Sequence, residues 1–250
     1  MLRVIAERYR QGYRTGKFPA QEPNLPARFR GLPVCQPDCP PGCRDCLAQC
    51  PFAACQFKDG ELAIDLGRCL FCADCQACAQ GRIRFSTEYR LAVSSRQALW
   101  RQQSREFELA LPLASDLRKL FGRSLKLRQV SAGGCNACEA DCNVLNTLVF
   151  DLGRFGIQFV ASPRHADGIL VTGALTANMQ SALLTTYEAV PTPKIVIAVG
   201  ACALGGGPFQ GSPEVGQGLD ALLPVDLFIP GCPPHPYTIL DGLLRLLGKR

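Results

Sequence analysis

Two groups of closely spaced cysteines stand out in the first third of this 250-residue sequence. The first group reads C-P-P-G-C-R-D-C-L-A-Q-C-P, and the second reads C-L-F-C-A-D-C-Q-A-C. Three thiolates at such tight spacing can hold three corners of an iron–sulfur cube, and a remote fourth cysteine then closes the other cube of a pair. The spacing therefore predicts two interlaced 4Fe–4S clusters.

The interlaced arrangement assigns four ligands to each cluster. We expect the first cluster to bind Cys39, Cys43, Cys46 and Cys78. We expect the second cluster to bind Cys69, Cys72, Cys75 and Cys50, which a proline follows as in the bacterial cysteine run. Two intervals depart from that run, because the first interval of the first group is wider and the last interval of the second group is narrower. Cys35 could therefore replace Cys39, and Cys55 is a further candidate ligand.

A disulfide framework and a zinc site are the alternatives to iron and sulfur. The first residues carry scattered charges and no apolar stretch of a secretory signal, so we expect an intracellular chain whose dense cysteines bind metal. Zinc sites take four ligands, usually as two separated cysteine pairs. Each group here supplies at least three close cysteines and no histidine. The pattern favours iron–sulfur clusters, and a zinc-stabilised interaction scaffold is the rival from another class of protein.

Four more cysteines lie in glycine- or proline-rich loops of the second half of the sequence. Cys135 and Cys138 belong to G-G-C-N-A-C-E, Cys202 to G-A-C-A-L-G-G-G, and Cys232 to P-G-C-P-P. Each loop follows an apolar, strand-like run, and such runs alternate with helical stretches, which predicts a parallel sheet with helices on both faces. The carboxyl ends of parallel strands share one edge, where such folds bind ligands. We therefore expect these four cysteines to hold a third 4Fe–4S cluster.

The expected elements of this half follow from the apolar pattern. Strands are predicted over Leu125–Val130, Ile157–Ala161, Gly168–Gly173, Lys194–Gly200 and Leu227–Pro230. Helices are predicted over Ala140–Leu152, over Ala177–Ala189 with Thr176 as the N-cap, and over Tyr237–Leu247. The whole chain divides into an arm over residues 1–34, a two-cluster ferredoxin-like domain over 35–92, a helical linker over 93–123 and an α/β domain over 124–250.

The cysteine-rich region resembles the two-cluster bacterial-type ferredoxins, and more narrowly the ferredoxin-like subunits of formate hydrogenlyase and of complex I-like assemblies. The resemblance rests on the two cysteine groups and on the segment F-S-T-E-Y-R-L-A over residues 85–92. It implies an α+β fold that carries the first two clusters.

The stretch from about Val130 to Leu244 resembles the small subunit of the membrane-bound, energy-converting nickel–iron hydrogenases, including formate hydrogenlyase. The matching motifs are G-G-C-N-A-C-E, F-G-I-Q-F-V-A-S-P-R-H-A-D, V-T-G-A, G-A-C and V-D-L-F-I-P-G-C-P-P. The family also includes a complex I subunit whose two leading cysteines are adjacent, whereas Cys135 and Cys138 are separated as C-x-x-C. The resemblance implies a flavodoxin-like fold, a proximal 4Fe–4S cluster and a catalytic large subunit as partner. The chain looks like a fusion of two subunits.

Several further residues are candidates for a role near the third site. Cys142 lies one helical turn beyond Cys138 and is expected to pack inward. Glu139 is a candidate for a proton path. His165 is expected to have a structural role beside the site, and His235, which follows the Cys232 loop, to contact a partner. The glycines over 203–207 lack the signatures of a phosphate-binding loop.

Composition limits the partners. The formal charge is +6, but no basic run is interleaved with aromatic residues, so nucleic acid is not expected. No apolar run approaches the ~18 residues of a membrane span.

We expect an electron-transfer subunit with three 4Fe–4S clusters and no catalytic residues of its own, cytoplasmic and peripheral on the inner face of the cell membrane. Its expected partners are a nickel–iron-type catalytic large subunit and other subunits of a membrane-bound complex. The alternative is the equivalent subunit of a complex I-like quinone oxidoreductase without nickel.

Overall fold

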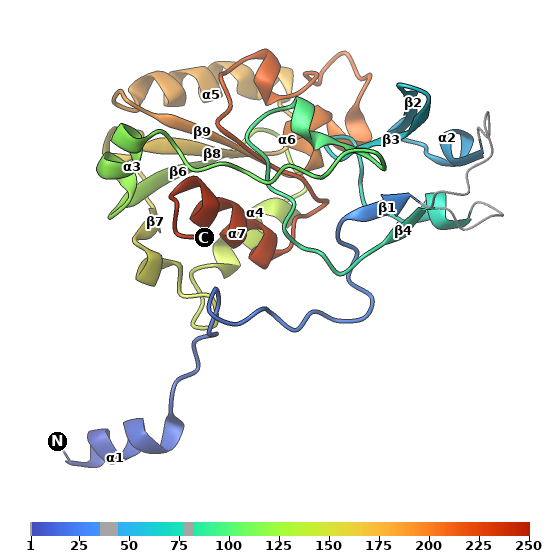
Figure 1. Cartoon of the computed structure of the whole chain (residues 1–250). Helices are drawn as coiled ribbons and strands as arrows, with labels where there is room; N and C mark the ends of the chain where they lie inside the picture. Colours follow the sequence, from blue (N-terminus) through green and yellow to red (C-terminus); the bar gives the residue numbers. More distant parts are fainter. Residues whose placement is uncertain (1, 36–44, 78–82) are drawn as a thin grey trace.

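The computed structural model describes residues 2–35, 45–77 and 83–250 (Figure 1). A five-stranded sheet forms the centre of the second half of the chain, and its strands are β6 (Leu125–Ser131), β7 (Ile157–Phe159), β8 (Gly168–Thr172), β9 (Ile195–Val199) and β10 (Leu227–Ile229). The spatial order is β10-β9-β8-β6-β7, and every neighbouring pair is parallel. Counted from the first strand of this sheet, the order is 2-1-3-4-5, which is the flavodoxin-like arrangement. The predicted fold class is confirmed.

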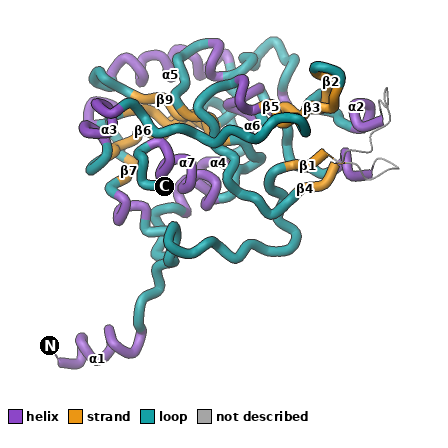
Figure 2. The backbone as a smooth tube through the Cα atoms, in the orientation of Figure 1, coloured by secondary structure: helices purple, strands orange, loops and turns teal. Residues whose placement is uncertain are grey.

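Helices cover both faces of this sheet (Figures 1 and 2). One face is covered by α5 (Ala177–Ala189) and the other by α4 (Ala137–Val144) and α7 (Pro236–Leu246). Successive residues of β8 divide between the faces, as a strand requires. Ile169 and Val171 pack with Leu183 of α5, whereas Leu170 packs with Leu243 of α7. Burial on both faces explains why β8 and β9 read as apolar runs, whereas β6 alternates between buried and exposed residues in its first half.

The helix expected over Ala140–Leu152 has different bounds in the structure. It begins at Ala137, ends at Val144, and is followed by a separate 3-10 helix, η3 (Leu152–Phe155). Asn136 adopts a left-handed backbone with φ of 70° and fixes the start, and Asp151 does the same with φ of 48° before η3. The earlier start places Cys138 in the first turn of α4. Over Ala177–Ala189 the predicted helix is confirmed, although the Thr176 hydroxyl donates to the carbonyl of Ala132 and does not cap it.

The region expected to be a helical linker, residues 93–123, contains only one short α-helix, α3 (Ser115–Phe121). A 3-10 turn, η2 (Gln97–Leu99), leads directly into strand β5 (Trp100–Gln102). β5 pairs antiparallel with β3 (Glu61–Asp65), so this segment completes a sheet of the cysteine-rich region. The expectation of a helical linker holds for α3 and not for residues 100–102, because these residues pair with β3.

The cysteine-rich region is built from short antiparallel pairs. β1 (Pro33–Cys35) pairs with β4 (Ile83–Phe85), which brings the two ends of the region together. β2 (Cys55–Lys58) and β3 form a hairpin at Asp59–Gly60, where both residues have positive φ, as a two-residue Asp-Gly turn requires. Helix α2 (Asp45–Gln49) contacts the 3-10 helix η1 (Asp74–Ala77).

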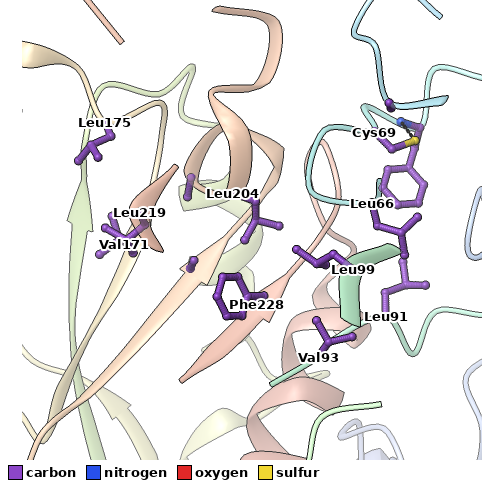
Figure 3. Close-up of a cluster of buried hydrophobic side chains, with 14 of the residues drawn as sticks. Leu66, Cys69, Leu91, Val93, Leu99, Val171, Leu175, Leu204, Leu219 and Phe228 are labelled. Atoms are coloured by element: carbon purple, nitrogen blue, oxygen red, sulfur yellow. Dashed lines mark hydrogen bonds between the residues drawn. The ribbon is translucent and has the colours of Figure 1, made fainter. Parts of the chain in front are cut away.

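The two halves share one hydrophobic cluster (Figure 3). It runs from Val171 and Leu204 through Phe228 to Leu99 and Leu66. Backbone hydrogen bonds in both directions between Val93 and Phe228 tie the second half to the segment that follows β4. The cysteine-rich region therefore packs directly on the parallel sheet.

Helix α1 (Leu2–Gln11) stands apart from the rest of the molecule (Figure 1). Further along the arm, Phe18 is buried against the rings of Tyr89 and Tyr237. Among the described helices, none combines the length and the apolar character needed to cross a bilayer.

Candidate metal centres

The four cysteines predicted for the third site all follow strands of the parallel sheet. Cys135 and Cys138 follow β6, Cys202 lies in α6 (Ala201–Gly205) directly after β9, and Cys232 follows β10. Burial, together with the charges of Cys232 and Cys135, raises the pKa of Cys202 to about 11. Burial also raises the pKa of Cys138, and Cys202 and Cys232 add to that effect. The four sulfurs are thus close enough to sense one another at the carboxyl edge.

Two glycines leave room for these sulfurs. A Cβ at Gly200 would lie 2.5 Å from the Sγ of Cys138, and a Cβ at Gly207 would lie 2.7 Å from the Sγ of Cys202. Both glycines have positive φ, at +89° and +56°. A larger residue at either position would displace the neighbouring sulfur. The backbone at both positions is therefore shaped to keep the thiols together.

The donor chemistry of the third site suits an iron–sulfur cluster. Cys138 and Cys202 are buried, whereas Cys135 and Cys232 are exposed. A buried thiol is unfavourable as a bare anion, which burial shows by raising the pKa of Cys138 and Cys202, and metal binding offsets that cost because the metal takes the thiolate. Among the described residues, no group of three or more His, Cys, Asp or Glu side chains is placed to hold a single metal ion. The four cysteines that follow the strands match in number the four thiolates that a 4Fe–4S cube takes, one at each iron.

Glu139 is buried immediately beside this site. Its Oε1 accepts hydrogen bonds from the hydroxyls of Ser131 (2.5 Å) and Thr172 (2.8 Å). These hydroxyls stand at the carboxyl ends of β6 and β8, the two strands on either side of the switch in strand order. Glu139 therefore connects α4 to the edge that carries the cysteines.

The remaining predicted residues around this site have different outcomes. Cys142 is fully buried in the core next to α7, as expected for an inward-packed cysteine. His165 lies in η4 (Pro163–His165), directly before β8 and therefore at the opposite edge of the sheet, so its expected place beside the site is wrong. The Nδ1 of His235 accepts from the backbone N–H of Tyr237 (3.1 Å) at the start of α7. Burial lowers the pKa of His235, which suits this acceptor role.

The four cysteines predicted for the second site line one small closed cavity of about 20 Å³. Cys50 follows α2, Cys69 and Cys72 lie in the loop after β3, and Cys75 lies in η1. Cys55, at the start of β2, lines the same cavity. The structure thus brings five sulfurs together where the sequence assigned four.

A buried carboxylate shapes the loop that presents Cys69. The Asp65 side chain accepts two hydrogen bonds from Arg96 (2.8 and 2.6 Å) and one from the backbone N–H of Gly67 (2.9 Å). Its backbone carbonyl accepts from the N–H of Cys69 (2.9 Å). The Sγ of Cys69 in turn accepts from the N–H of Phe71 (3.4 Å), the kind of contact that a cluster ligand receives. Sequence reasoning gave no indication of this Asp65–Arg96 pair.

The predicted first site lies largely outside the described residues. Cys39, Cys43 and Cys78 fall in the undescribed segments, and only the backbone of Cys46, in α2, is described. Cys35, the alternative to Cys39, is buried at the end of β1.

The second and third sites adjoin each other. Leu70 lines both the five-sulfur cavity and a neighbouring cavity of about 350 Å³ that Cys232 and Phe71 also line. The charge of Cys72 contributes to the raised pKa of Cys232, after burial and Cys135. The guanidinium of Arg30 donates to the carbonyls of Phe71 (3.0 Å) and Cys72 (2.8 Å) across this junction.

A flavodoxin-like parallel sheet with cysteine loops on its carboxyl edge is typical of metal-binding α/β proteins. Comparison with known proteins identifies the family. Residues 135–246 match the family described as NADH ubiquinone oxidoreductase, 20 Kd subunit. A Pyrococcus furiosus protein named "Probable membrane-bound hydrogenase subunit mbhJ" is 45% identical over 135 residues, which cover 54% of this chain and 81% of the relative. The chain belongs to this family of oxidoreductase subunits, whose members bind an iron–sulfur cluster.

Two further relatives show the range of the family. Formate hydrogenlyase subunit 7 of Escherichia coli is 44% identical over 54% of this chain and 53% of its own length. An NADH-quinone oxidoreductase subunit of Citrifermentans bemidjiense is 47% identical over 46% of this chain and 68% of its own length. The chain spans only about half of the formate hydrogenlyase subunit.

Proposed function

We propose that the protein is the electron-transfer subunit of a membrane-associated nickel–iron hydrogenase complex of the formate hydrogenlyase type. A ferredoxin-like region, residues 35–92, carries two 4Fe–4S clusters, and the α/β domain carries a third. The proposal rests above all on the gathering of Cys135, Cys138, Cys202 and Cys232 at one sheet edge, next to the five-sulfur cavity.

When bound, the clusters supply one-electron chemistry, and the protein's part is to hold, space and shield them. Gly200 and Gly207 give the sulfurs of the third site their room. Leu70 places an apolar side chain between the second and third sites, because it lines the cavities on both sides of the junction. Arg30 fixes the backbone on the second-site side of that junction. Clusters held by the cysteines of these two sites would supply the route for electrons to or from the large subunit.

A nickel–iron partner is favoured by the spacing of Cys135 and Cys138, because the complex I subunits that the chain resembles have adjacent cysteines there. The second candidate, a quinone oxidoreductase without nickel, is supported by the 47% identity to the NADH-quinone oxidoreductase relative. Purifying the native complex and sequencing its large subunit decides between them. Two C-x-x-C pairs in that large subunit support the hydrogenase, and their absence supports the quinone enzyme.

The number of clusters is tested on protein isolated without oxygen. Three 4Fe–4S clusters require about twelve irons and about twelve sulfides per chain and three reducible centres in electron paramagnetic resonance spectra. Two clusters or fewer in fully loaded protein would contradict the assignment. Zinc without sulfide would instead support the scaffold alternative.

A further inference from the structure

The five-sulfur cavity holds one cysteine more than a cube needs. A 4Fe–4S cube has four irons and takes four thiolates. Cys50, Cys69, Cys72 and Cys75 match the predicted set, which leaves Cys55. Cys55 is only 5% exposed, so water does not supply a hydrogen-bond partner for its thiol. The role of this fifth thiol rests on the cluster assignment proposed above.

The backbone around the two candidates for the fourth ligand differs. Cys50 lies in an irregular turn whose backbone N–H groups, from Phe52, Ala54 and Cys55, point to its sulfur. Converging N–H groups are an anion-binding arrangement, which suits a thiolate bound to a cluster. Cys55 is held in the β2–β3 ladder opposite Ile64, and its sulfur faces other sulfurs. This contrast makes Cys50 the ligand and Cys55 the spare thiol.

The contacts of Cys55 show what the spare thiol does. Its side chain is in hydrogen-bonding reach of the sulfurs of Cys50 and Cys75, which come from different elements. A thiol carries one hydrogen and is a weak donor, whereas a ligand thiolate is a charged acceptor. Hydrogen bonds to ligand sulfurs tune the potential of a cluster. They stabilise the reduced, more negative state more than the oxidised one.

We propose that Cys55 binds no iron and is a positioning residue of the second cluster, and that its single S–H hydrogen is shared between the ligand sulfurs of Cys50 and Cys75. It links the α2 side of the site to η1 and raises the reduction potential of that cluster alone. Cys55→Val removes the donor while keeping side-chain volume and the strand preference of β2. Cys55→Ser keeps a donor.

The test measures cluster content and potential in the full chain, isolated without oxygen. Cys55→Val is expected to keep the wild-type iron and sulfide content and to lower one potential. A threefold change in the reduction equilibrium corresponds to about 30 mV for a one-electron couple. The other two potentials stay unchanged. In Cys55→Ser the potential stays at or above the wild-type value. Cys142→Val, at another fully buried cysteine, is the control and should leave the second cluster's potential unaltered.

A spectroscopic signature separates the hydrogen bond from a packing effect. An exchangeable proton coupled to the reduced second cluster, observed by electron–nuclear double resonance, should vanish in D₂O and in Cys55→Val but persist in Cys55→Ser. Loss of about four irons in Cys55→Val, with Cys50→Ala keeping them, would make Cys55 the ligand and overturn the proposal. Unchanged potentials in Cys55→Val would also overturn it. Wild-type protein without sulfide would instead overturn the proposed function.

Discussion

Gly200 shows how much one missing side chain contributes to the third site. It has φ of 89° and ψ of 153° between β9 and α6, a region of backbone space that is essentially reserved for glycine. A Cβ there would meet the Sγ of Cys138 at 2.5 Å. Gly200→Ala should therefore displace Cys138 and remove the third cluster, about four irons of twelve, while the other clusters remain. Iron and sulfide assays with electron paramagnetic resonance check this.

Gly211→Ala is the matched control for backbone strain. Gly211 has φ of 83°, but no heavy atom lies within 4 Å of the added Cβ. We expect this variant to lose about 1–2 kcal/mol of stability and to keep every cluster. If both variants lose the same signal, strain and not the contact with Cys138 is the cause. Wild-type iron content in Gly200→Ala would contradict the placement of the third site.

At the scale of an element, Asp65 ends β3 and organises the loop to Cys69. Asp65→Asn keeps the shape but removes the charge that pairs with Arg96 and holds the N–H of Gly67. Breaking a buried ion pair costs about 3–5 kcal/mol, and the partial exposure of Arg96 places the expected loss near the lower end. The second cluster should bleach at a lower temperature than in the wild type, by several degrees.

Asp59→Asn is the control on the same hairpin. Asp59 pairs with Arg105 at the surface, where both side chains are well over half exposed, so the expected loss is below about 1 kcal/mol. Equal bleaching temperatures in the two variants would show that the Asp65 pair does not support the Cys69 loop.

The elements that the sequence predicts well are the strands whose residues are almost all apolar. β8 and β9 are buried along their whole length, so their apolar runs leave no other assignment. β5 could not be predicted, because Trp100–Gln102 is too short to show an alternating pattern and becomes a strand by pairing with β3. The placement of the four cysteine loops at one edge of the sheet followed from topology, because the carboxyl ends of parallel strands share that edge. Cys55 and the Asp65–Arg96 pair depend on side-chain contacts between segments, which spacing does not reveal.

At the scale of the whole molecule, the cysteine-rich region and the α/β domain form one packed unit within the described residues. The shared hydrophobic core includes Leu66 of the cysteine-rich region and Phe228 of the α/β domain (Figure 3). In addition, the Gln210 side chain donates a hydrogen bond to the carbonyl of Phe52 at 2.6 Å. A Cβ on Gly205 would come within 3.0 Å of the Gly67 carbonyl, so α6 and the Asp65 loop are in close contact. This packing fixes the spacing between the second and third sites, as a relay needs.

Arg30 tests that fixed spacing. Arg30→Gln removes two charge-assisted hydrogen bonds to the carbonyls of Phe71 and Cys72, about 1 kcal/mol for such partly exposed contacts. The Cys72 loop should then move relative to Cys232, and the magnetic interaction between the reduced second and third clusters should weaken. Arg28→Gln is the control, because Arg28 lines the same cavity but makes no hydrogen bond with the described residues. An unchanged interaction in Arg30→Gln, or an equal loss in Arg28→Gln, would show that the shared core and not Arg30 sets the distance between the clusters.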